Sequence, residues 1–113
     1  MSLFYKQPPE IEEGNREYKL KLNIMDTTRF DKFVSQMKYR LYEGNGKALY
    51  IIGITDDGQP VGITEEEMEI SINEMKKVVK ILDAKINTIR YYNGTNGFIT
   101  TIKIVKKLDV FVF

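Results

Sequence analysis

The fold is decided between Gln36 and Ile63, where the chain reads QMKYRLYEGNGKALYIIGITDDGQPVGI. This stretch predicts a helix end, a glycine-containing turn over residues 43–46, a strand over Lys47 to Thr55 and a tight hairpin. The run Leu49-Tyr50-Ile51-Ile52 leaves the strand without a polar side. We therefore expect that both of its faces are covered or that it sits in the middle of a sheet.

The hairpin is predicted at Asp56-Asp57-Gly58-Gln59, because Asp-Gly is a strong short turn signal. Residues Pro60 to Ile63 then form a short strand. We place this strand at a sheet edge, since a proline cannot donate a backbone hydrogen bond to a neighbouring strand.

Upstream of this stretch the pattern predicts a strand followed by a helix. Glu17 to Met25 alternates, with apolar side chains at every second position and polar ones between them, which is typical of a strand with one wet side. Asp26-Thr27-Thr28 offers an N-cap. A single apolar helical stripe follows, formed by Phe30, Phe33, Val34, Met37 and Leu41.

Downstream, Thr64 and Glu67 have the spacing of a capping box for a second helix that ends near Leu82. Its inward stripe is Met68, Ile72, Met75, Val79 and Leu82. Two further strands are expected over Ala84 to Tyr92 and Phe98 to Lys107. The order β-α-β-β-α-β-β predicts an α+β two-layer sandwich, with both helices on one face of a mostly antiparallel or mixed sheet.

The domain organisation follows from the two ends of the chain. Residues 1–16 contain Pro8 and Pro9 and little periodicity, so we expect a flexible arm there. Residues 17–107 are expected to form a single domain. Residues 108–113 resemble the beginning of another strand, which we interpret as the start of a following domain or a tail.

Composition excludes several kinds of site. The 113 residues contain no cysteine and no histidine, so disulfides, thiolate metal sites, Cys nucleophiles and a histidine general base are all excluded. No glycine cluster has the spacing of a phosphate-binding loop, and we attribute these glycines to turns. No apolar run reaches the length of a membrane span and no signal peptide is visible, so we expect a cytoplasmic chain. We expect no cofactor in this domain.

The net charge of +1 hides a segregation along the chain. Seven acidic residues and no basic residue lie between Asp56 and Glu74, whereas eight basic residues accompany only Asp83 between Met75 and Lys107. Basic side chains on a sheet face would suit a phosphate backbone, and Tyr91 and Tyr92 could stack on unpaired bases. A solvated lysine-rich surface explains the same pattern. The candidate RNA- or partner-binding residues are Lys38, Arg40, Lys76, Lys77, Lys80, Arg90, Lys103, Lys106 and Lys107.

A divalent-cation site is a second hypothesis. Asp56 and Asp57, with Glu12 and Glu17, supply carboxylate oxygens of the kind that Mg²⁺ or Mn²⁺ prefers. The alternative is that Asp56 and Asp57 make only the turn and that Glu17 is a solvated strand residue.

Several segments resemble a known family in the same order. They are Pro8-Pro9-Glu10, Glu12-Glu13-Gly14-Asn15, Glu17 to Leu22, Gln36 to Leu41, Glu43 to Gly46 and Gly53-Ile54 with Asp56-Asp57-Gly58 and Val61-Gly62. This pattern is similar to an accessory domain of GTP-binding proteins one and two, relatives of elongation factor one-alpha that include archaeal members. The resemblance implies a domain that precedes a GTPase domain, with the nucleotide chemistry outside this chain.

A second resemblance is to the AlbA-like domain of Schlafen proteins, through Glu17-Tyr18-Lys19 and Gly53 to Gly58. That likeness implies a metal-dependent RNA-processing domain using Glu12, Glu17 and Asp56, although Thr55 interrupts the acidic run.

Three functions remain open from the sequence. The first is a non-catalytic accessory module of a translational GTPase that contacts RNA, the ribosome or its own GTPase domain. The second is the metal-dependent ribonuclease. The third is self-association as a homodimer, through the edge strand or through Leu108 to Phe113.

Overall fold

The computed structural model describes residues 16–23 and 25–107. The elements follow the order β1 (Arg16–Lys19), α1 (Thr27–Glu43), β2 (Lys47–Ile52), α2 (Glu65–Ile81), β3 (Lys85–Asn93) and β4 (Phe98–Val105). The strands form one sheet in the order β1-β2-β4-β3. β1 is parallel to β2, whereas the other pairs are antiparallel, so the sheet is mixed.

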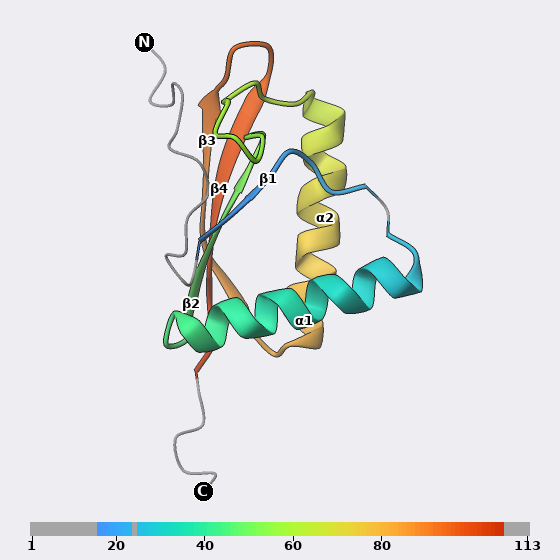
Figure 1. The fold of residues 1–113 in the computed structure, drawn as a ribbon, viewed down its shortest axis with the longest axis vertical. Helices are drawn as coiled ribbons and strands as arrows, with labels where there is room; N and C mark the ends of the chain where they lie inside the picture. Colours follow the sequence, from blue (N-terminus) through green and yellow to red (C-terminus); the bar gives the residue numbers. More distant parts are fainter. Residues whose placement is uncertain (1–15, 24, 108–113) are drawn as a thin grey trace, which may run out of the picture.

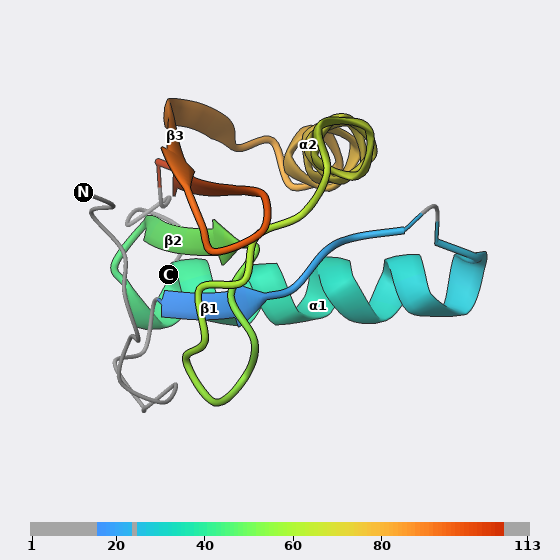
Figure 2. The same cartoon turned by 90° about the horizontal axis from the view of Figure 1, so that it is seen from above.

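Both helices lie on the same side of the sheet, as Figure 1 shows. Seen from above, β1 and β3 are at the two edges of the sheet (Figure 2). The predicted α+β fold class, with its two layers and both helices on one face, is confirmed. Neither helix of the described part of the chain is long and apolar enough to cross a membrane.

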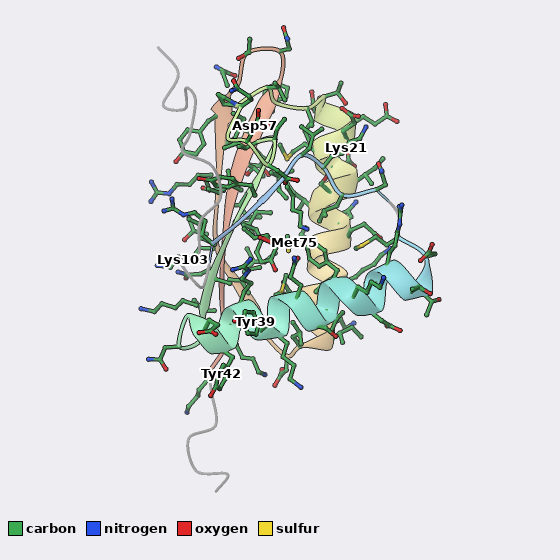
Figure 3. All side chains as sticks on the ribbon, in the orientation of Figure 1. Lys21, Tyr39, Tyr42, Asp57, Met75 and Lys103 are labelled. Atoms are coloured by element: carbon green, nitrogen blue, oxygen red, sulfur yellow. The ribbon has the colours of Figure 1, made fainter. Side chains whose placement is uncertain are left out.

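The main core lies between the sheet and the helices. It joins Phe33, Met37 and Leu41 of α1 to Met68, Met75 and Val79 of α2, and to Ala48, Tyr50, Ile52, Ile102 and Ile104 of the sheet. Figure 3 places Met75 in this layer, between α2 and the strands. A second buried cluster uses the other side of the sheet and contains Tyr18, Ile51, Ile54 and Ile99. β2 lies between β1 and β4, so the expectation that this strand sits in the middle of the sheet is confirmed.

Local signals predicted the helix starts correctly. The Asp26 side chain accepts a hydrogen bond from the Arg29 amide at 2.8 Å. Thr64 and Glu67 form the expected capping box, in which each side chain accepts from the other residue's backbone amide. Caps depend on residues within one turn, so the sequence alone is enough to place them.

The strand predicted over Glu17 to Met25 is wrong beyond Lys19. The chain leaves the sheet there and crosses to α2, where the Leu22 amide donates to the Ser71 hydroxyl at 2.9 Å. The Met25 amide donates to the Glu74 carboxylate at 2.9 Å. These two side chains of α2 replace a strand partner for the backbone, and Leu20 is left exposed.

The edge strand predicted over residues 60–63 is also wrong. Only one bridge forms there, between Ile63 and Phe98. Gly62 has a φ of +84°, which lies outside the β region, and a Cβ at this position would lie 2.5 Å from the carbonyl carbon of Gly97. The segment therefore crosses closely over the β3–β4 turn instead of continuing as a strand. The Asp-Gly turn itself is present, with the Gly58 amide donating to the Thr55 carbonyl at 2.9 Å.

The expectations for the two ends of the chain concern residues 1–16 and 108–113. The arm was predicted to include Arg16, but this residue begins β1. The remainder of the arm, Ile24 and the predicted strand start over residues 108–113 lie outside the described residues.

Candidate nucleic-acid interface

The face of the sheet that neither helix covers, called here the open face, carries five basic residues. The strand register places Lys47, Val105 and Lys85 in one row across the sheet. The next row contains Arg16, Leu49, Lys103 and Thr88, and the third contains Ile51, Thr101 and Arg90. Neighbouring positions in such rows lie within reach of long side chains. Figure 3 shows Lys103 on the side of the sheet away from both helices.

A bulge in β3 makes this arrangement possible. The register shifts between Ile86 and Thr88, so that Asn87 is an extra residue in β3. Without this shift, strict alternation would put Lys85 and Arg90 on opposite faces. The bulge returns both to the open face, while Ile86 and Ile89 pack against the main core.

No carboxylate in the strands shares the open face. Glu17 is the single acid in the four strands, and it points to the helix-covered face. The five basic residues Arg16, Lys47, Lys85, Arg90 and Lys103 make no ion pair with another residue in the part of the chain that the structure describes. Such a set of like charges creates a positive potential over this face.

The predicted candidates divide between the two layers of the fold. Lys103 and Arg90 lie on the open face, and Lys107 is exposed just beyond the end of β4. Lys76 and Lys80 are exposed on α2, and Lys38 is exposed on α1. Lys85, at the start of β3, lines a shallow pocket with Lys76 and Lys80. Nothing in the described part of the chain joins these helix lysines to Lys103 and Arg90 on the sheet face.

Three of the predicted candidates have structural partners. The Arg40 guanidinium donates to the Glu17 carboxylate at 3.0 Å, and the side chains of Arg40 and Glu17 are 15% and 4% exposed. The Lys77 ammonium pairs with Glu74 at 2.6 Å. The Lys106 ammonium donates to the Leu82 carbonyl at 2.6 Å, where it stabilises the C-terminal end of α2.

The two tyrosines suggested for base stacking do not share a face. Tyr92 pairs with Ile99 and packs half-buried against the second cluster on the open face. Tyr91 pairs with Thr100 and points to the helix side, where it is 60% exposed. A joint stacking platform on the basic side is therefore ruled out by alternation along β3.

The carboxylates suggested for a metal site are separated by their environments. Glu17 is buried against Arg40 on the helix-covered face, whereas Asp56 is exposed in the turn after Thr55. Asp57 accepts a hydrogen bond from the Thr55 hydroxyl within the same turn. Glu12 lies outside the described residues. Within residues 16–23 and 25–107, no group of three acidic side chains is close enough to hold a metal ion.

Sequence reasoning missed Arg16, Lys47 and Lys85 as members of the basic set. Lys47 could have been found, because it shares its parity with Leu49 and Ile51 in the strand that was predicted best. Lys85 could not have been found, because the face of the sheet that it occupies depends on the bulge in β3. Arg16 could not have been found either, because the alternating pattern did not mark it as the start of β1.

Two acids of α2 show why its charges are structural. Burial would raise the pKa of Glu74, but hydrogen bonds from Lys77 and from the Met25 amide outweigh it, and the pKa lies below its usual range. The pKa of Glu67 is lowered to about 2, first by the hydrogen bond from Lys21 and then by the Thr64 amide. Residues 20–23 and 25–26, which join β1 to α1, are called here the crossing segment. Figure 3 shows Lys21 of this segment beside α2. These acids hold the crossing segment onto the helix.

Comparisons with known proteins give the relatives of the chain. It is 47% identical to human GTP-binding protein 2 over 83 residues, which cover 74% of this chain and 14% of the relative. The chain resembles a segment of a GTP-binding protein. It is 28% identical to Xenopus laevis GTP-binding protein 1 over 69 residues, covering 61% of this chain and 11% of that protein.

A third relative is an uncharacterized protein of Acanthamoeba polyphaga mimivirus, 28% identical over 103 residues, which cover 89% of this chain and 55% of the relative. This chain therefore spans only part of each of these relatives. No protein-family model matches the sequence, and no solved structure matches it. The similarity supports the expected relation to GTP-binding proteins one and two; the elongation-factor, archaeal and Schlafen likenesses stay predictions.

Proposed function

We propose that this chain is a non-catalytic domain of a GTP-binding protein and that it contacts RNA through the open face of its sheet. The observation that carries the RNA contact is the basic set Arg16, Lys47, Lys85, Arg90 and Lys103, which has no strand carboxylate on the same face. Basic side chains in adjacent rows of a sheet suit the regularly spaced charges of a phosphate backbone.

The chemistry of the chain supports a binding role. The sequence has no histidine, no cysteine and no phosphate-binding loop. Two of the acids suggested for metal-dependent cleavage have different environments: Glu17 is buried and pairs with Arg40, whereas Asp56 lies in an exposed turn. Nucleotide binding and hydrolysis are accordingly proposed for a part of the protein that these residues do not include.

The contact should be electrostatic and independent of base sequence. The cations of the open face are spread over three rows of the sheet, and Tyr92, the aromatic side chain of β3 on this face, is half-buried. Backbone contacts of this type release counterions, so the affinity falls as salt rises. We therefore expect the logarithm of the binding constant to fall linearly with the logarithm of the salt concentration.

The test compares two double variants with the same change in charge. Arg90→Glu with Lys103→Glu removes cations from the open face, and Arg29→Glu with Lys32→Glu removes an exposed pair from α1. Binding to single-stranded polyuridylate is measured by fluorescence anisotropy across a salt series. Loss of two phosphate contacts should reduce the magnitude of the salt slope by about 1.4 and weaken binding by about tenfold or more, while the α1 variant keeps the larger slope.

Equal weakening by both double variants would contradict the proposal, because it would mean that only total charge matters. Absence of binding by the unmodified chain at low salt would contradict it as well.

A further inference from the structure

A groove on the helix side of the molecule is separate from the basic face. It encloses about 640 Å³ between α2 and the β3–β4 pair. Met68 and Ile72 form its floor, and Tyr91 and Phe98 form a wall that is 60% and 40% exposed. The relative positions of α2 and the β3–β4 pair can be followed in Figures 1 and 2.

The α2 side of the groove is one continuous stripe of the helix. It consists of Glu65, Met68, Glu69, Ile72, Asn73 and Lys76, which recur at intervals of three and four residues. At 1.5 Å per residue this stripe is about 16 Å long, the length of three helical turns. Small molecules are usually bound in enclosed pockets. An open groove of this length, with apolar side chains along its centre and charged ones at its ends, fits a polypeptide segment better.

The charges around the groove select the sign of the occupant. Glu65 and Glu69 lie at the N-terminal end of the stripe, whereas Lys76 lies at the other end. Glu66, in the same first turn of α2, is also exposed. These carboxylates repel phosphates, so the groove does not extend the proposed RNA surface.

We propose that this groove binds a short peptide segment of a protein partner, with apolar anchor side chains and with lysine or arginine at the end that meets Glu65 and Glu69. The anchors would contact Met68, Ile72, Tyr91 and Phe98, and an acid at the other end of the segment would face Lys76. Exposed aromatic side chains beside an apolar floor are the usual energetic centre of such contacts. The domain then has two binding surfaces of opposite character, and this one does not depend on RNA binding.

The experiment selects peptides from a random phage-displayed library on the immobilised full chain. The expected peptides contain at least two apolar residues at helical or alternating spacing and a basic end. Tyr91→Ser with Phe98→Ser should weaken their binding by about tenfold, the size expected when central anchors lose their pocket. Tyr42→Ser with Ile81→Ser is the matched control, because both residues are exposed but neither lines the groove.

Charge reversal gives a second readout that does not depend on the aromatic wall. A selection on the Glu65→Lys, Glu69→Lys variant should return peptides with an acidic end. Failure to enrich any peptide, or enriched peptides that bind the wall variant as well as the unmodified chain, would overturn the proposal.

Sedimentation of the chain alone tests whether a second copy of the chain fills the groove. A dimer that the wall variant abolishes would mean that a second copy fills the groove, which also overturns the proposal. Polyuridylate binding by the wall variant should be unchanged, so that a failure here is distinguishable from a failure of the RNA contact.

Discussion

On the helix-covered face of the sheet, Glu17 is the single strand carboxylate, and Arg40 pairs with it at 3.0 Å under α1. On the open face, five basic residues occupy three adjacent rows, and no strand carboxylate lies beside them. The two faces belong to the same four strands, yet one uses charge to hold the layers together and the other leaves charge available. A charged residue in the sequence is therefore a candidate for binding only when the structure shows that it does not belong to an ion pair that holds the fold together.

Removing Glu17 should have the largest effect of the changes considered. Glu17→Ala removes the buried carboxylate that accepts from the Arg40 guanidinium at 3.0 Å, and breaking a buried pair in this way costs about 3 kcal/mol in the free energy of unfolding. Urea denaturation followed by circular dichroism measures this loss. Glu65→Ala, at an exposed position, should change the free energy of unfolding by less than about 0.5 kcal/mol.

The double variant Glu17→Ala with Arg40→Met should recover part of the stability lost in Glu17→Ala, because both charges of the pair are then replaced by apolar groups. A Glu17→Ala protein as stable as the unmodified chain would contradict the structural role, and would make Glu17 available for the metal site that its sequence suggested.

The crossing segment between β1 and α1 gives an intermediate effect. Ser71→Ala removes the hydroxyl that accepts from the Leu22 amide at 2.9 Å, in a buried place where water cannot replace it. The expected loss in the free energy of unfolding is about 1 kcal/mol, because the cost of an unsatisfied amide is partly offset by the better helix propensity of alanine. Native-state hydrogen exchange of the Leu22 amide should accelerate in this variant, and unchanged exchange would contradict the contact.

The smallest predicted effect concerns acid. The pKa of Glu67 is lowered to about 2, so the contribution of this carboxylate to stability is complete above pH 4.5 and is lost as the pH falls toward 2. Glu67→Gln keeps a side chain that can close the capping box but loses the charge that pairs with Lys21. The stability difference between the two proteins should be largest at neutral pH, decrease below pH 4.5 and vanish only below about pH 2. A difference that stays constant across this range would contradict the assigned pKa.

The sequence predicted features that depend on nearby residues and failed where distant residues decide. Both helix caps, the Asp-Gly turn and the central strand were found, because each is specified within a few positions. The alternation after Lys19 suggested a longer strand, but Ser71 and Glu74 of α2 capture that backbone from 49 residues away. In the sequence Glu74 resembles a solvated helix residue. In the structure it is buried, and its carboxylate accepts hydrogen bonds from the Lys77 ammonium and the Met25 amide.

The candidate site was predicted in part. Lys103 and Arg90 were named from the charge pattern, and both lie on the open face. Arg40, Lys77 and Lys106 were named with equal reason, yet each has a partner that only the folded chain provides. The bulge at Asn87 decides which side of the sheet the β3 residues occupy, and no turn or glycine in the sequence marks it.

Lysine footprinting of the full chain tests the contrast between the two faces most directly. The chain is labelled with an amine-reactive reagent, with and without single-stranded polyuridylate, and the modified residues are identified by mass spectrometry. RNA should protect Lys47 and Lys103 on the open face, while Lys32 and Lys38 on α1 react equally in both samples. Protection of the helix lysines, with the open-face lysines unprotected, would contradict the account.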